Sequence, residues 1–211
     1  MDIHGVWRKQ KVAYDTCRDC DVSFQNPMLT PDACRTFYSS GEYRRVVNHK
    51  PGVADSVIGG QERRAKAVME LLSPRLASVD RHLDIGSGAG ILIREVGKHY
   101  GCVGIGVELD GDYVAFAAEQ GVESGPDMPD GTFDLITIVH TLEHLARPMD
   151  MLRQINERLR GYLYVEVPTN EYDVVHPFMF NEKSLRTAIE MSGMAVLEMG
   201  KNARGDLWAW G

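Results

Sequence analysis

The spacing of apolar residues changes character at residue 81. From there onward, short apolar runs alternate with segments whose apolar residues recur every three or four positions, and these two periods indicate buried strands and amphipathic helices. The predicted strands are Arg81–Ile85, Cys102–Val107, a weak one at Gly121–Ser124, Phe133–His140, Tyr162–Val167, Ala195–Met199 and Leu207–Trp210, and the predicted helices are Gly90–Tyr100, Asp112–Gln120, Pro148–Leu159 and Glu182–Ser192. This alternation predicts an α/β fold with a doubly wound sheet, in which ligands bind beyond the carboxyl ends of the strands.

The chain before residue 81 has no single sustained period. Residues 1–50 are polar with scattered aromatic residues, and we expect them to form a small appendage to a main domain of residues 51–211. Thr30 and Pro31 suit the N-cap and first position of a short helix that reaches about Tyr43.

A join and a further helix are predicted between this appendage and the first strand. Residues 48–60 are expected to form a flexible join because they contain Pro51, Gly52, Gly59 and Gly60. Residues 61–72 place apolar side chains on one side and charges on the other, which predicts an amphipathic helix.

Composition and charge exclude several classes of protein. The 211 residues carry a net charge of −7, which makes a nucleic acid an unlikely partner because phosphate binding needs clustered Lys and Arg. No apolar run approaches the roughly 20 residues that cross a bilayer, and the N-terminus lacks a signal-peptide pattern. We therefore expect a cytoplasmic protein without membrane association, and a homodimer remains open.

The chain has four cysteines, and two of them are close together: Cys17, Cys20, Cys34 and Cys102. The Cys17-x-x-Cys20 pair suits one half of a tetrahedral zinc site. His4, Cys34 and His49 could complete the site only through folding, since their spacing is not that of a standard zinc finger. Two interpretations stay open. In the first, the pair belongs to a zinc site or a vestigial zinc knuckle, and in the second it is two reduced thiols in a loop.

The strongest chemical signal follows the first predicted strand. Gly86, Gly88 and Gly90 recur with period two, and glycine allows a sharp turn and close approach of the backbone to a ligand. The turn opens a helix, whose free N–H groups face the same crevice. Asp84, two positions before the first glycine, would repel a pyrophosphate and suits a cationic amine or sulfonium.

Glu108 comes at the end of the second predicted strand. An acidic side chain at this place accepts hydrogen bonds from the ribose hydroxyls of a bound nucleoside. The Gly-x-Gly-x-x-Gly spacing of a dinucleotide site is absent, which disfavours a nicotinamide enzyme.

Five motifs together resemble the class I S-adenosylmethionine-dependent methyltransferases, and within them the subgroup of ubiquinone-biosynthesis and sugar methyltransferases. They are Asp84-Ile85-Gly86-Ser87-Gly88-Ala89-Gly90, Val107-Glu108-Leu109-Asp110, Gly131-Thr132-Phe133-Asp134-Leu135-Ile136, Leu142-Glu143-His144-Leu145 and Val165-Glu166-Val167-Pro168. The resemblance covers residues 61–199. It implies a seven-stranded sheet of order 3-2-1-4-5-7-6 with an antiparallel final hairpin.

The resemblance also implies where the cofactor S-adenosylmethionine binds. The methionine end would lie at residues 84–90, the ribose at Glu108, and the adenine between Leu109 and the loop at Asp127 and Met128. The expected cofactor-binding residues are Asp84, Gly86, Ser87, Gly88, Gly90, Glu108, Leu109, Asp127, Met128 and His140.

Residues of the acceptor side follow the fourth and fifth predicted strands. His144 is a candidate general base for a hydroxyl acceptor, Glu143 could orient it, and His176 lies after the fifth strand. In some relatives such a Glu-His pair and a later histidine hold a divalent metal. An inverted zinc-protease motif is rejected because His140 ends a strand.

The N-terminal part is similar to the second half of a zinc-ribbon leader found on many of these methyltransferases. The similar segments are residues 14–20, 24–27, 38 and 41–43, and the first Cys pair of the ribbon is missing. The predicted function is methyl transfer to a small hydroxyl or sugar-type compound. The alternatives are a metal-assisted methyltransferase acting on an RNA or glycan end, and a non-catalytic binding module.

Overall fold

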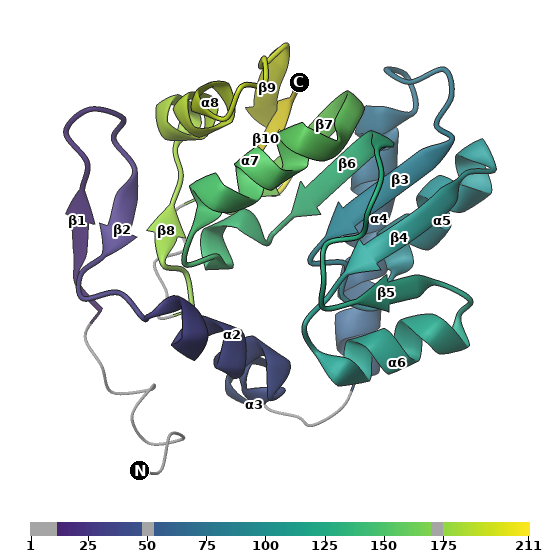
Figure 1. Cartoon of the computed structure of the whole chain (residues 1–211), viewed down its shortest axis with the longest axis horizontal. Coiled ribbons are helices and arrows are strands. Elements are labelled where there is room, and N and C mark those ends of the chain that lie inside the picture. Colours follow the sequence, from purple (N-terminus) through teal and green to yellow (C-terminus); the bar gives the residue numbers. More distant parts are fainter. Residues whose placement is uncertain (1–11, 48–52, 170–174) are drawn as a thin grey trace.

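The main domain is built around one seven-stranded sheet. The computed structural model describes residues 12–47, 53–169 and 175–211 (Figure 1). The strands of the sheet are β3 (Arg81–Ile85), β4 (Val103–Val107), β5 (Glu123–Gly125), β6 (Phe133–Val139), β7 (Leu159–Val167), β9 (Glu198–Lys201) and β10 (Leu207–Trp210). Their order is β5-β4-β3-β6-β7-β10-β9, which confirms the predicted order 3-2-1-4-5-7-6.

The direction of the strands also agrees with the prediction. β3 pairs in parallel with β4 and β6, and the outer neighbours β5 and β7 continue the parallel arrangement. β10 pairs antiparallel with both β7 and β9. The carboxyl ends of β3, β4 and β6 therefore meet at one edge of the sheet.

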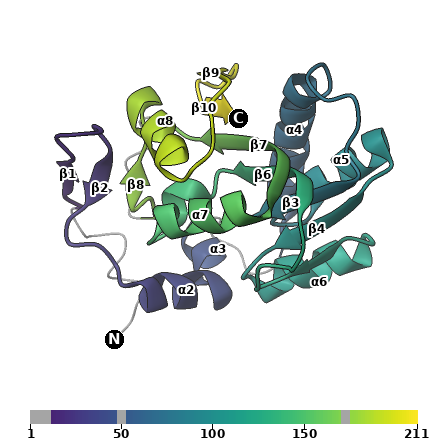
Figure 2. The same cartoon turned by 45° about the horizontal axis from the view of Figure 1, so that its top comes forward.

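Helices cover both faces of this sheet (Figures 1 and 2). They are α4 (Asp55–Leu72), α5 (Ile91–Tyr100), α6 (Gly111–Glu119), α7 (Pro148–Arg158) and α8 (Glu182–Met191). One apolar core contains side chains of α7 and α8, and a second contains side chains of α4 and α5. No helix among the described residues is both long and apolar enough to span a membrane.

The expectation of a flexible join up to Gly60 is wrong for residues 55–60. α4 begins at Asp55 and includes Gly59 and Gly60. Val57 and Ile58 pack against the second core, and this burial outweighs the low helix propensity of the two glycines. Pro51 and Gly52 lie outside the described residues, as do His4 and His49.

The N-terminal part forms a hairpin and two short helices, where the sequence predicted only one helix. Strands β1 (Tyr14–Thr16) and β2 (Ser23–Gln25) join β8 (Phe178–Met179) in a sheet of order β1-β2-β8. α2 (Pro31–Ser39) and α3 (Glu42–Val47) are separated at Gly41, whose φ is 71°. The hydroxyl of Thr30 accepts from the N–H of Ala33, so its predicted N-cap role is confirmed.

Candidate active site

The glycine turn after β3 has left-handed backbone at all three glycines. The φ angles of Gly86, Gly88 and Gly90 are 74°, 53° and 73°. A Cβ on Gly86 would lie 2.1 Å from Oγ1 of Thr141, and a Cβ on Gly90 would lie 2.9 Å from Cγ1 of Val122. Glycine at these two positions therefore allows close packing of the turn on neighbouring elements as well as its backbone conformation.

Glu108 is held by the backbone at the end of β4. Its Oε2 accepts from the N–H of Gly88 at 2.8 Å, and its Oε1 accepts from the N–H of Asp110 at 2.9 Å. Burial raises the pKa of Glu108, while these donors act in the opposite direction. The carboxylate is thus fixed against the glycine turn, where the sequence placed a ribose-binding acid.

Asp84 ends a buried chain of hydrogen bonds. The hydroxyl of Thr137 donates to Oδ1 of Asp84 at 2.6 Å and lies 2.8 Å from Nε2 of His82. All three side chains are buried. Burial raises the pKa of Asp84 to about 7 and lowers that of His82 to about 3. A neutral His82 therefore donates to Thr137, which in turn orients the carboxyl group of Asp84.

A cavity of about 800 Å³ opens above these groups. It is within the range of 300–1,000 Å³ typical of small-molecule sites. Its wall contains several of the predicted cofactor residues: Asp84, Gly86, Ser87, Gly88, Glu108, Leu109 and His140. Pro126 lines it on the predicted adenine side, whereas Asp127 is exposed and Met128 packs against the first core.

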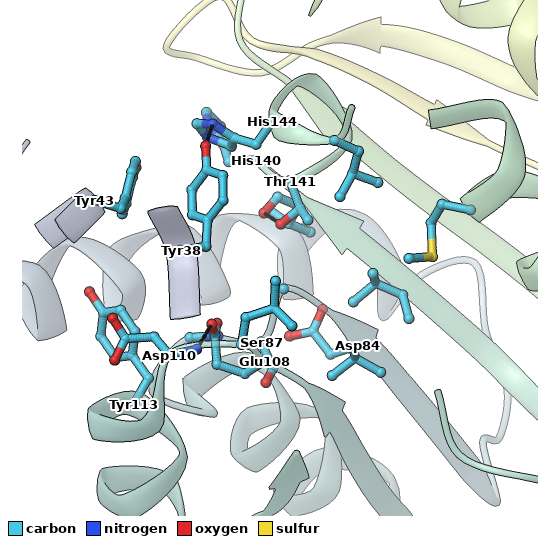
Figure 3. A pocket seen from close by; sticks show the side chains of 18 of the residues that line it. Tyr38, Tyr43, Asp84, Ser87, Glu108, Asp110, Tyr113, His140, Thr141 and His144 are labelled. Carbon is cyan, nitrogen blue, oxygen red and sulfur yellow. Dashed lines mark hydrogen bonds between the residues drawn. The ribbon is translucent and has the colours of Figure 1, made fainter. Parts of the chain in front are cut away.

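Figure 3 shows two groups of side chains in this cavity. Asp84, Ser87 and Glu108 lie together on one side, and Tyr38 and His144 lie together on the other. The hydroxyl of Ser87 is buried, has no hydrogen-bond partner among the described residues, and lies against Gly106 of β4, where a Cβ would come within 2.3 Å of its oxygen.

The side chain of His144 is 11% exposed and has a defined tautomer. Its Nδ1 lies 2.8 Å from the carbonyl oxygen of Val175 and 2.9 Å from the hydroxyl of Tyr38. Because a carbonyl can only accept, Nδ1 carries the proton and Nε2 keeps its lone pair. Burial, with the charge of His176 as the next cause, lowers the pKa of His144 to about 3.

The other two predicted acceptor-side residues lie close to His144. Nε2 of His144 is 3.6 Å from Oε1 of Glu143, and the ring centroids of His144 and His176 are 4.7 Å apart. Glu143 and His176 are buried, and neither is among the described residues that line the cavity. One ligand atom from each of the three residues lies within 4.8 Å of the others, a spacing that could hold a metal ion.

His140 belongs to a second ionic cluster that is linked to the first, since its Nδ1 lies 3.9 Å from Oε1 of Glu143. Its Nε2 is 3.2 Å from Oε1 of Glu166 and 3.3 Å from Oδ2 of Asp206. Burial opposes a charge on the ring, but these two carboxylates outweigh it and raise the pKa of His140 to about 9. The ring is therefore cationic at neutral pH. The backbone of His140 has a φ of 50°, in the left-handed region.

The sequence did not identify the aromatic wall of the cavity. Tyr38 and Tyr43 come from α2 and α3, and both rings make edge contacts with His144. Both tyrosines belong to the segments that resemble a zinc-ribbon leader, but their contact with His144 spans more than 100 residues and leaves no sign in a local motif. The α4 residues Gln61 and Arg64, which also line the cavity, were equally missed.

The Cys17 and Cys20 pair lies in the turn between β1 and β2. Backbone N–H groups of Cys20 and Asp19 are the main causes that lower the pKa of Cys17. Neither of the two candidate metal-binding groups among the described residues contains a cysteine. The structure gives no support to zinc binding by this pair, which stays a prediction.

Solved structures with the same fold come from several methyltransferases. The 1,6-didemethyltoxoflavin-N1-methyltransferase of Burkholderia thailandensis is 16% identical, with a TM-score of 0.70 over 95% of this chain and 98% of its own. The magnesium protoporphyrin IX methyltransferase of Synechocystis PCC 6803 is 13% identical, with a TM-score of 0.65 over 87% of this chain and 97% of its own.

A third similar structure is a complex. It joins the Haloferax volcanii Trm112 methyltransferase activator and a putative methyltransferase, and the match has 18% identity and a TM-score of 0.65 over 74% of this chain and 93% of the matched chain. At these identities the similarity establishes the fold.

The family follows from a match at the level of sequence. The family model described as a methyltransferase domain matches residues 59–199, which is well over half of the chain and includes the glycine turn, Glu108 and His144. The resemblance to class I methyltransferases is confirmed at this level, and the chain belongs to the methyltransferase domain family.

Proposed function

We propose that the protein binds S-adenosylmethionine and transfers its methyl group to a hydroxyl group of a small, sugar-type acceptor. The observation that carries the proposal is the pair of acids beside the glycine turn. Asp84 and Glu108 line one cavity, and Glu108 accepts from two backbone N–H groups. This arrangement suits a nucleoside whose ribose hydroxyls donate to Glu108 and whose other end is cationic.

Other features of the cavity fit the same cofactor. The two acids beside the turn would repel the pyrophosphate of a dinucleotide. Two of the structurally similar methyltransferases carry this cofactor or its product, with SAM bound in the Synechocystis enzyme and S-adenosylhomocysteine in the Burkholderia enzyme.

The chain's own residues would act mainly by orientation. The cofactor, when bound, supplies an electrophilic methyl group on a sulfonium. Tyr38 and Tyr43 form an aromatic wall on the other side of the cavity and would hold an acceptor against the turn. Holding the acceptor atom and the methyl group in line lowers the free-energy barrier of a bimolecular reaction by a large part.

His144 could remove the acceptor proton only through Nε2. That nitrogen keeps its lone pair because Nδ1 donates to Val175, but the low pKa of His144 makes it a weak base before ligands bind. A hydroxyl acceptor therefore needs further activation, or a proton transfer that is coupled to methyl transfer.

Calorimetry tests the cofactor. The protein should bind S-adenosylhomocysteine and not a nicotinamide dinucleotide, and Asp84→Ala and Glu108→Ala should each abolish binding. Normal affinity of both variants for S-adenosylhomocysteine would contradict the proposal. A folded protein that binds the cofactor but methylates no compound in a panel of sugars and other hydroxyl compounds, assayed with labelled S-adenosylmethionine, would support the non-catalytic alternative.

A metal-assisted reaction is the second candidate. It is favoured by the closely spaced group of Glu143, His144 and His176, because metal ligands must be unprotonated and a metal-binding histidine commonly donates its other N–H to a carbonyl. Glu143, His144 and His176 would hold the ion, which would lower the pKa of an acceptor hydroxyl. Titration of the protein with Mg²⁺, Mn²⁺ and Zn²⁺ tests it, and equal binding by His176→Ala would contradict it.

A further inference from the structure

Three ionisable side chains meet where the ends of three neighbouring strands come together. His140 follows β6, Glu166 lies in β7, and Asp206 precedes β10. The N–H of His140 donates to the carbonyl oxygen of Glu166 at 2.8 Å, and Glu166 pairs with Trp208 in the antiparallel ladder of β7 and β10. The backbone of the sheet therefore holds these side chains together, whatever lies between them.

Nε2 of His140 is almost equally far from one oxygen of each carboxylate. The distances are 3.2 Å to Oε1 of Glu166 and 3.3 Å to Oδ2 of Asp206. Two donor atoms that bind one ion at about 2.1 Å are about 3.0 Å apart at an octahedral angle and about 3.4 Å apart at a tetrahedral angle. Both measured distances fall within this range.

A proton on the ring does not satisfy this group. Nε2 of His140 and Oε1 of Glu166 are buried, and neither has a hydrogen-bond partner among the described residues. An N–H bond points in one direction, and here it is aligned with neither carboxylate. The side chain of Glu166 is 1% exposed, and a buried carboxylate oxygen without a donor is costly. An ion between the three residues would give each of these atoms a bond.

The outer contacts of the two carboxylates suit metal ligands. The hydroxyl of Tyr164 donates to Oε2 of Glu166 at 2.8 Å, and the amide of Asn202 donates to Oδ2 of Asp206 at 3.2 Å. A carboxylate oxygen has two lone pairs, so this oxygen can accept one hydrogen bond and bind an ion. Nε of Arg204 is 3.7 Å from the same oxygen, but its side chain is 60% exposed and solvent screens its charge.

The surroundings also favour a cation at this place. The two carboxylates raise the pKa of His140 to about 9, although burial and the positive charge of Arg64 act in the opposite direction. A divalent ion would balance both carboxylates and leave the imidazole neutral. Its binding would replace the ring proton, which leaves to solvent.

We propose that His140, Glu166 and Asp206 bind a divalent transition-metal ion, which ties β10 to the wall of the cavity. One imidazole and two carboxylates suit Zn²⁺ or Mn²⁺, with the higher affinity for Zn²⁺. His140 lines the cavity, so the ion would lie in the wall between strand ends. The site shares no residue with the group of Glu143, His144 and His176, and it does not depend on the proposed cofactor.

Calorimetry with Zn²⁺ on the full chain tests the ligands. Glu166→Gln and Asp206→Asn should each weaken Zn²⁺ binding by at least about 100-fold, because losing a ligand costs more than losing an outer contact. Tyr164→Phe removes only the donor to Glu166 and should weaken binding by about 10- to 100-fold. Failure of the unmodified protein to bind Zn²⁺, or unchanged affinity in Glu166→Gln, would overturn the site.

Two control variants separate this site from other binding. Glu190→Gln removes an exposed carboxylate of α8 that lies 3.3 Å from Arg186, and it should bind Zn²⁺ as the unmodified protein does. His176→Ala removes a member of the other candidate group and should keep the ion at His140. Loss of all Zn²⁺ binding in His176→Ala, with full binding in Glu166→Gln, would assign the ion to the other group and overturn this one.

A measurement on the unmodified protein keeps the test independent of the folding of variants. Crystals soaked in Zn²⁺ should show an anomalous density peak about 2.1 Å from Nε2 of His140 and from one oxygen each of Glu166 and Asp206. A peak beside His144 alone, or no peak, would overturn the proposal.

Discussion

Asp84 has the most consequential ionisation among the cofactor-side residues. Burial raises its pKa to about 7, and the charge of Glu108 contributes in the same direction. A carboxyl group whose pKa is raised is protonated over a wider range of pH, and it prefers to ionise when a cation is nearby. Cofactor binding should therefore be linked to pH near neutrality.

We expect the affinity for S-adenosylmethionine to rise with pH up to about 7 and to level off above it. Below the pKa of Asp84 the cationic cofactor must displace a proton from this carboxyl group. The dissociation constant of S-adenosylmethionine should therefore increase by up to about tenfold for each unit by which the pH falls. Calorimetry between pH 5.5 and 8.5 measures this slope. In Asp84→Asn the contribution of this group should vanish, and a flat profile in the unmodified protein would refute the expectation.

Thr137→Val should move that profile to higher pH. The hydroxyl of Thr137 stabilises the ionised form of Asp84, and valine has a similar shape without the donor. The midpoint should lie above 7, with weaker binding at neutral pH. Thr187→Val, which removes only a hydroxyl bonded to the carbonyl of Lys183 on α8, is the control. Equal midpoints in the two variants would show that Thr137 does not act on Asp84.

At the residue scale, sequence reasoning could name candidates where polar side chains follow a strand end directly, and their binding roles stay predictions. Asp84, Ser87 and Glu108 were identified because each comes at or just after a strand, and the structure brings them to one cavity. His82, Thr137 and Tyr38 were missed because their roles depend on partners 53 to 106 residues away. No local pattern carries such a contact.

At the scale of elements, the turn between β3 and α5 is defined by what its backbone touches. Gly86 needs both a left-handed conformation and the absence of a side chain, because Thr141 occupies the space of its Cβ. Gly101, which follows the last residue of α5, has a φ of 71°, and apart from its chain neighbours no atom of the described residues lies within 4 Å of the position that a Cβ would take there. Comparing Gly86 with Gly101 therefore separates the effect of the left-handed backbone from the effect of crowding by a neighbouring side chain.

Gly101→Ala should lower the free energy of unfolding by about 1–2 kcal/mol, the cost of a left-handed alanine. Gly86→Ala should add about 1–3 kcal/mol for overpacking and should also weaken S-adenosylhomocysteine binding. Urea denaturation and calorimetry measure the two effects. Equal destabilisation of the two variants would show that the contact with Thr141 relaxes freely.

Strong periodicity predicted the elements of the main sheet well, and weak periodicity did not. Leu207–Trp210 was predicted at the same bounds as β10, since four consecutive apolar residues follow the polar pair Gly205-Asp206 and define the start of the strand. β1, β2 and β8 have two or three residues each, too short for a period to show. The start of α4 was missed because its stability comes from core packing rather than from propensity.

At the scale of the whole molecule, the N-terminal hairpin is attached to residues 176 and 177, which lie beside His144. The hydroxyl of Tyr14 and the side-chain amide of Gln25 both donate to the carbonyl oxygen of His176, at 2.6 and 3.1 Å. The N–H of Gln25 donates to the carbonyl oxygen of Pro177 at 2.9 Å. The predicted division at residue 50 stays a prediction, and these contacts show that the two parts share one sheet.

The double variant Tyr14→Phe/Gln25→Ala should loosen residues 175–179. It removes both side-chain donors to His176, so amide exchange of this segment should accelerate by about five- to thirtyfold, the effect of 1–2 kcal/mol of lost local stability. Hydrogen-exchange mass spectrometry measures it. Asn26→Ala, which removes a bond to Asp15 within the exposed hairpin, should leave the segment unchanged, and equal protection in all three proteins would contradict the attachment.

The position of β10 has a consequence for how the sheet is assembled during synthesis. β9 leaves the ribosome first, but its place is beyond β10, which alone connects it to β7. The edge of β7 therefore stays open until residues 207–210 have been made, although the turn that holds Asp84 and Gly86 is complete more than a hundred residues earlier. A chain interrupted before Leu207 would expose an unpaired strand edge, which is a template for aggregation.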